Sequence, residues 1–138
     1  MIHTIGYENT TPAGLIGALR GAGVQTLVDV RALANSRKPG FAKRALSEAL
    51  AGAGITYVHE KLLGTPAEGR AAVRAGRPAV MREIFAVHLR GAEQQDALAR
   101  LGARARAERV CLLCLEADPA HCHRTLVAEA VGLPIRHL

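Results

Sequence analysis

Aromatic residues are scarce in this chain of 138 residues, which has two tyrosines, two phenylalanines and no tryptophan. Proteins that stack bases need several aromatic side chains, so this kind of nucleic-acid platform is disfavoured. No apolar run approaches the roughly 18 residues of a membrane-spanning helix. The opening Met1 to Gly6 lacks the basic start and long apolar run of a signal peptide. We therefore expect a cytoplasmic protein with an aliphatic core and no membrane partner.

Cysteine is also sparse, and its number is odd: there are three. In a chain without an export signal, this indicates reduced thiols rather than a disulfide framework. Cys111 and Cys114 have the spacing of a chelating pair, but residues three apart on a strand face opposite sides of the sheet. No other set of cysteines and histidines has a standard ligand spacing, so no metal site is predicted. A Cys/His redox or metal-binding protein remains an alternative, in which zinc would be held by Cys114, Cys122 and His123 or by a site that includes His121 and His59.

Two cofactor motifs are absent, the Gly-x-Gly-x-x-Gly fingerprint and the P-loop, so no cofactor is expected. The formal net charge is +6, and 15 of the 18 basic residues are arginine. Residues 70–109 hold nine arginines against four acidic residues, whereas the last 29 residues are net −1. The simplest interpretation is a solvated basic helical face. A non-catalytic nucleic-acid-binding module using that face is an alternative function.

Hydrophobic periodicity predicts an alternation of strands and helices. The predicted strands cover residues 2–7, 26–31, 55–59, 110–115 and, at an edge, 134–138. The predicted helices cover residues 12–20, 41–50, 78–90, 93–106 and about 119–131. Residues 62–76 show no clear periodicity and are predicted as a mobile loop or an irregular helix.

This pattern predicts a three-layer α/β fold: a mostly parallel, Rossmann-like sheet of about five strands with helices on both faces. We expect one domain over residues 1–138, with the strand at 110–115 in the centre of the sheet. In a Rossmann-like order, the first strand would lie between the second and the fourth.

Polar side chains follow three of these strands. Asp29 and Arg31 are two residues apart, as are Cys114 and Glu116, so each pair projects to one side of its strand. Tyr7 ends the first strand. Because ligands bind at the carboxyl ends of parallel strands, we expect these residues to meet in one crevice. Asp29 and Glu116 are candidate general acid/base residues, and Tyr7 is a candidate binding residue.

The segment after the fourth strand is equally dense in reactive groups. Asp118 followed by proline is typical of a helix start, which would place Cys122, His123 and Arg124 in the opening turns. A helix N-terminus attracts anions and lowers the pKa of a nearby thiol. Cys122 is therefore a candidate nucleophile and His123 a candidate binding residue. Adjacent helical residues point about 100° apart, so a base for Cys122 would come from elsewhere, such as His59.

Arginines and a loop hydroxyl complete the candidate site. Arg31, Arg37 and Arg124 can clamp a phosphate or carboxylate, and Ser36 lies on the loop beside them. Structural alternatives are that Asp29 caps a turn and pairs with Arg31, that Arg124 forms a salt bridge, and that Ser36 and Arg37 lie on an ordinary solvated loop.

Taken together, these motifs resemble the domain-of-unknown-function family numbered 488, over nearly the whole chain. The residues that carry the resemblance are Thr4–Tyr7, Leu27–Arg31, Ser36-Arg37, Gly40-Phe41, Ile55–Tyr57, Leu63-Gly64, Cys114–Glu116 and Cys122–Arg124. The family usually has a proline where this chain has Ala32 to Asn35, and a second glycine where it has Thr65. The resemblance implies a compact intracellular α/β domain but no established activity.

The sequence thus predicts an α/β enzyme, a hydrolase or group transferase, that acts on a small anionic or nucleotide-like substrate at the carboxyl edge of the sheet. The predicted catalytic residues are Asp29, Glu116 and Cys122. The predicted binding residues are Tyr7, Arg31, Ser36, Arg37, His123 and Arg124.

Overall fold

The computed structural model describes residues 1–138. The strands are β1 (Ile2–Gly6), β2 (Thr26–Asp29), β3 (Thr56–His59), β4 (Val110–Cys114) and β5 (Ile135–His137). The α-helices are α1 (Pro12–Gly21), α2 (Lys43–Gly52), α3 (Ala67–Arg74), α4 (Pro78–Leu89), α5 (Ala92–Ala107) and α6 (His123–Val131). Two 3₁₀ turns, η1 (Lys61–Leu63) and η2 (Pro119–His121), join them. None of the helices has the length and apolar character needed to cross a membrane.

All strand pairs of the sheet are parallel, and the order is β3-β2-β4-β1-β5. The predicted parallel sheet, its central fourth strand and the edge position of the last strand are therefore confirmed. The expected contact between the first two strands is wrong, because β4 lies between β1 and β2. Periodicity identifies strands but carries no information about which strands pair. The three strands with polar ends are nevertheless neighbours.

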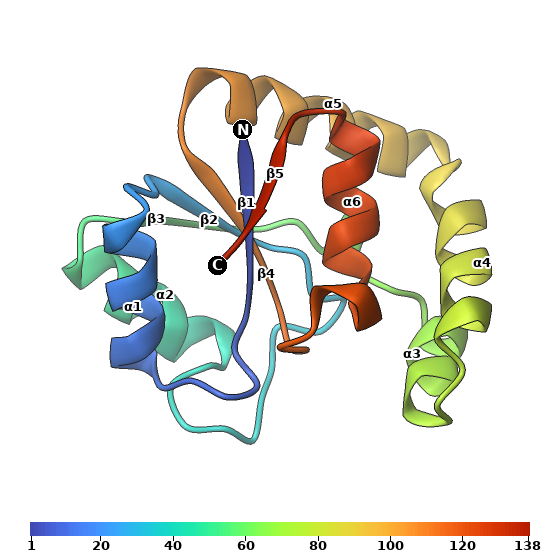
Figure 1. Cartoon of the computed structure of the whole chain (residues 1–138), viewed down its shortest axis with the longest axis horizontal. Helices are drawn as coiled ribbons and strands as arrows, with labels where there is room; N and C mark the ends of the chain where they lie inside the picture. The colour runs from blue at the N-terminus through green and yellow to red at the C-terminus, as the bar shows by residue number, and fades with distance from the viewer.

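The sheet is covered on both faces, which gives the predicted three layers (Figure 1). Leu15 and Leu19 of α1, with Leu46 and Leu50 of α2, pack on one face. Helices α3 to α6 contribute to a second apolar cluster on the other face. β4 serves both clusters, since its alternate side chains point to opposite faces.

Local signals explain where the first helix begins and why the last one begins late. Thr11 caps α1 by accepting a hydrogen bond from the Gly14 amide at 3.1 Å, and Pro12 opens the helix. Asp118 does cap a turn, but only the 3₁₀ turn η2. Cys122 is extended, with φ −121° and ψ 139°, so α6 begins at His123 instead of near residue 119.

The chain leaves the sheet toward different faces at neighbouring strand ends. After β1 and β2 it continues into α1 and α2, whereas after β4 it continues into α6 on the opposite face (Figure 1). Such divergence opens a crevice above the carboxyl ends of the strands, the usual ligand position in open α/β sheets. In this protein the divergence occurs on both sides of β4.

Candidate functional site

A pocket of about 340 Å³ lies at this edge of the sheet. This is within the range of small-molecule sites. Polar and reactive side chains from four separate segments line it. They are Tyr7, Arg31, Asn35, Thr65, Arg70, Arg74, Cys114, Glu116, His121 and His123.

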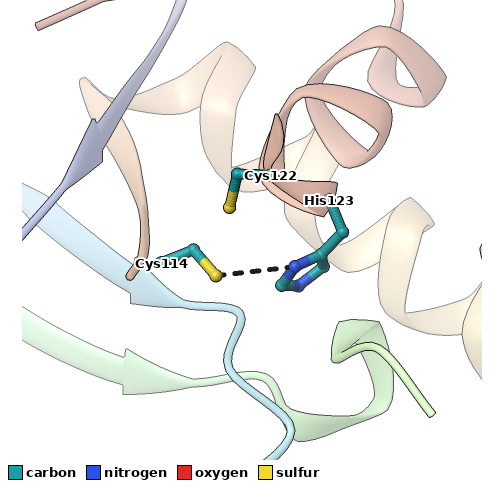
Figure 2. A group of neighbouring side chains, drawn as sticks. All are labelled: Cys114, Cys122 and His123. Carbon is teal, nitrogen blue, oxygen red and sulfur yellow. Dashed lines mark hydrogen bonds between the residues drawn. The ribbon is translucent and has the colours of Figure 1, made fainter. Parts of the chain in front are cut away.

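Two thiols and an imidazole form a buried cluster at the wall of this pocket. Cys114 comes from the end of β4, while Cys122 and His123 come from the start of α6 (Figure 2). The two sulfur atoms and one ring nitrogen all lie within 4.8 Å of one another. Cys114 Sγ is 3.5 Å from His123 Nδ1. Cys114 and His123 line the pocket, whereas Cys122 does not.

The imidazole of His123 is held in one orientation. Its Nε2 lies 2.7 Å from the carbonyl oxygen of Val30, and its ring meets Phe85 edge-on at 5.1 Å between centroids. A carbonyl only accepts hydrogen bonds, so Nε2 carries the proton and, in the neutral ring, Nδ1 presents its lone pair to the thiols. Burial disfavours charge on His123, but its contacts with Cys122 and Val30 raise its pKa above the usual value.

The expected lowering of the Cys122 pKa is wrong. Burial raises the pKa of this thiol well above its usual value, and the hydrogen bond to Cys114 adds to the effect. Only 3% of Cys122 is exposed. The proposed external base, His59, does not reach the cluster, because its Nε2 contacts the carbonyl oxygen of Arg31 at 2.8 Å.

Glu116 stands on the same side of β4 as Cys114, as predicted. The thiol of Cys114 donates to Glu116 Oε2 at 3.6 Å. The backbone here is fixed by two other residues. Arg124 donates to the carbonyl oxygens of Glu116 and Ala117. A Cβ on Gly6 would lie 1.9 Å from the same Glu116 oxygen, so only glycine allows β1 to approach this closely.

Arg124 therefore has a structural role: it is 1% exposed and does not line the pocket. The predicted structural alternative, a salt bridge to an acid, is also not what is found, since its partners are backbone carbonyls. These contacts hold the loop that carries Glu116, which makes Arg124 a positioning residue for that loop.

Asp29 and Arg31 form a buried ion pair beneath the pocket. Arg31 Nε donates to one carboxylate oxygen of Asp29 at 2.9 Å and Nη2 to the other at 2.6 Å. Tyr57 donates to Asp29 as well, and Arg31 Nη1 contacts Tyr7 and the Phe41 carbonyl. Burial opposes the charge on Arg31, but the bonds and charge of Asp29 raise its pKa above the usual value. Asp29 is fully buried and does not line the pocket.

Helix α3 supplies the other two arginines of the pocket. Arg70 and Arg74 are four residues apart, so they lie on one face of the helix. Arg70 donates to the Thr65 carbonyl at 2.9 Å, and Arg74 is exposed without a side-chain hydrogen bond or ion pair. The prediction that residues 62–76 are a loop or an irregular helix is wrong for 67–74, which form a regular helix.

The loop after β2 contributes less than expected. The Ser36 hydroxyl accepts a hydrogen bond from the Lys38 amide at 3.1 Å, and Arg37 is exposed. Neither residue lines the pocket. Lys38 donates to the carbonyls of Tyr7 and Glu8, which fastens the loop to the end of β1.

Of the nine predicted site residues, the structure brings four to the pocket: Tyr7, Arg31, Glu116 and His123. Asp29, Ser36, Arg37, Cys122 and Arg124 lie outside its lining. Sequence reasoning missed Arg70 and Arg74, although their i, i+4 spacing was a usable signal. It also noted Cys114 beside Glu116 without assigning it to the site.

The comparisons with known proteins agree with the motif resemblance. A family model described as Domain of unknown function DUF488 matches residues 11–131. The chain belongs to this family. No protein with a curated description and no solved structure matches it. Thr65, one of the positions at which the sequence departs from the motif resemblance, lines the pocket.

Proposed function

We propose that this protein is an enzyme, a hydrolase or group transferase, that acts on a small anionic or nucleotide-like substrate in the pocket beside β4. One observation carries the proposal. A single pocket combines two arginines of α3 with a carboxylate, a thiol and an imidazole at the carboxyl edge of the sheet. Groups that bind an anion and groups that transfer protons are thus within one ligand's reach.

Arg70 and Arg74 bind the anionic part of the substrate in this proposal. Their guanidinium groups are matched to phosphate or carboxylate oxygens. Arg31 contributes positive charge at the pocket floor, although most of its donors are occupied by Asp29, Tyr7 and Phe41.

Glu116 is the general acid/base residue in this proposal. It lines the pocket, whereas Asp29 is fully buried and paired. A carboxylate can transfer a proton only to a group within hydrogen-bonding reach. Of the two acids predicted for the general acid/base role, Asp29 and Glu116, we therefore assign the role to Glu116.

A second candidate is thiol catalysis by Cys114 and His123. The observation that favours it is the orientation of the imidazole, whose Nδ1 lone pair faces the Cys114 sulfur at 3.5 Å while Nε2 is bound to Val30. In this scheme His123 accepts the thiol proton and the Cys114 thiolate attacks the electrophilic centre of the substrate. The bond to the leaving group breaks, and the leaving group takes the proton from the imidazolium. Cys114, not Cys122, is then the nucleophile, because Cys114 reaches the pocket.

Calorimetric titration with inorganic phosphate and with AMP tests the anion site. Removing a charged hydrogen bond costs about 1.5–3 kcal/mol, so Arg70→Ala and Arg74→Ala should each weaken binding by about 10–100-fold. Arg82→Ala, an exposed arginine of α4, is the matched control and should bind like the parent protein. Equal affinity in all of these proteins would contradict the anion site.

The same titration separates this function from nucleic-acid binding. Arg100 pairs with Glu60 and Arg104 with Glu108, so part of the basic segment is neutralised locally. Binding to a nucleic-acid backbone should instead need the exposed arginines of α5 and fall steeply with salt. Neutralising Arg104 and Arg106 should therefore leave phosphate binding unchanged.

A further inference from the structure

The cluster of Cys114, Cys122 and His123 has a property that apolar packing does not explain. His123 Nδ1 faces only sulfur atoms, and both thiols approach it from different elements (Figure 2). Cys111 shows what a packed cysteine looks like in this protein. It is fully buried on the other face of β4, among the aliphatic residues of α1 and α2.

We propose that Cys114, Cys122 and His123 bind a zinc ion. This proposal rests on the proposed function, because it assumes that the pocket is the substrate site. It adds a metal cofactor to that site. Two thiolates and one neutral imidazole are typical ligands of Zn²⁺, and three protein ligands with one open position are typical of catalytic zinc. Two thiolates also neutralise the ion, which suits a buried site.

The spacing of the three ligand atoms fits this ion. With Zn–S near 2.3 Å and Zn–N near 2.0–2.1 Å, tetrahedral geometry separates ligand atoms by about 3.6–3.8 Å. Cys114 Sγ and His123 Nδ1 are already 3.5 Å apart, and all three ligand atoms lie within 4.8 Å. The upper limit of these separations exceeds the tetrahedral value by about 1 Å.

The supporting hydrogen bond is the one that a zinc-bound histidine needs. Such a histidine donates its other ring N–H to a carboxylate or backbone carbonyl, which fixes the tautomer and the ring plane. His123 Nε2 meets this requirement through the Val30 carbonyl at 2.7 Å, and Phe85 packs against the ring.

An ion held by these residues would adjoin the pocket, because two of the three ligands, Cys114 and His123, line it. Zinc lowers the pKa of a bound water. Glu116, whose Oε2 is 3.6 Å from Cys114 Sγ, would be the nearby carboxylate able to accept a proton from such a water. In the proposed function, Arg70 and Arg74 of the same pocket hold the substrate anion.

The test is zinc titration of reduced, metal-free protein, in competition with a chromophoric chelator. We expect one zinc per chain. Cys114→Ser, Cys122→Ser and His123→Gln should each weaken binding beyond the roughly 10–100-fold typical of losing only a supporting contact. Cys111→Ser, on the same strand but the other face, is the matched control and should bind like the parent protein.

Cobalt substitution tests the same site in the parent protein, so it still applies if one of the variants does not fold. Co²⁺ in the parent protein should give the absorption of a tetrahedral site with two thiolate ligands, at a stoichiometry of one. Absence of stoichiometric zinc, a cobalt spectrum without thiolate ligation, or equal loss of binding in Cys111→Ser would overturn the proposal.

The same set of proteins distinguishes the two proposals. If metal-free protein binds phosphate through Arg70 and Arg74 but takes up no zinc, only the zinc site fails, and rapid alkylation of Cys114 would then favour thiol catalysis. If zinc binds while phosphate and AMP do not, the proposed anion-binding enzyme fails and the metal site stands.

Discussion

Two pairs of arginines lie within or beside the pocket, but they are used differently. Arg31 and Arg124 are buried. Arg31 donates to Asp29, Tyr7 and the Phe41 carbonyl. Arg124 donates through its two Nη atoms to backbone carbonyls, while its Nε has no hydrogen-bond partner. Arg70 and Arg74 lie on helix α3 and line the pocket. Of the two, only Arg70 makes a side-chain hydrogen bond, to the Thr65 carbonyl. Burying a charge is costly unless it is paired or hydrogen-bonded, so most donors of Arg31 and Arg124 are committed to the fold. Arg70 and Arg74 make fewer such contacts and are the proposed ligand-binding pair.

The largest expected effect comes from the buried pair. Asp29→Ala leaves the Arg31 guanidinium buried without its carboxylate, which typically costs about 3–5 kcal/mol. We expect this loss in the free energy of unfolding measured by urea denaturation. Arg44→Ala, which removes an exposed ion pair with Glu48, should cost less than about 1 kcal/mol. Similar values for both variants would remove the distinction between buried and exposed arginines.

A smaller effect is expected where Arg124 and β1 fix the Glu116 backbone. Gly6→Ala places a methyl group 1.9 Å from the Glu116 carbonyl oxygen, and this oxygen belongs to backbone that cannot rotate away. Overpacking of this kind costs about 1–3 kcal/mol.

Gly17→Ala is the control for that change, because nothing lies within 4 Å of its added Cβ inside α1. Alanine in a helix interior should stabilise the protein by about 0.5–1 kcal/mol. Thermal unfolding of both variants gives the comparison. A Gly6→Ala protein as stable as its parent would show that the approach of β1 to this loop is not needed.

The smallest expected change in stability is that caused by replacing Arg70 and Arg74. The double variant Arg70→Ala, Arg74→Ala should unfold within about 0.5–1 kcal/mol of the parent protein, because the pair contributes a single hydrogen bond to the fold. Denaturation midpoints measure this. A loss as large as that of Asp29→Ala would mean that α3 depends on these arginines for folding, and that their proposed binding role lacks separate support.

The sequence predicted the elements well because their signals are local. The strands are apolar runs ended by polar residues, and Thr11-Pro12 marks the start of α1 through its own hydrogen bonding. The sequence pattern did not predict helix α3, and the reason is physical. Its buried residues are Gly69 and Ala72, so it has no large apolar stripe, and no side chain caps its N-terminus.

The strand order and the cysteine environments could not be predicted from local patterns. β4 lies between β1 and β2 although five α-helices precede it in the chain, so its neighbours in the sheet depend on the whole chain. The same holds for Cys122: a helix N-terminus favours a thiolate, but burial outweighs that effect in this protein. The polar strand ends were correctly expected to gather, because parallel strands share one carboxyl edge.

The most direct test of the central claim is a crystal structure of the protein grown with phosphate. We predict phosphate within hydrogen-bonding distance of both Arg70 and Arg74, in the pocket that also holds Glu116 and Cys114. Phosphate bound elsewhere on the surface, with this pocket occupied only by water, would contradict the account.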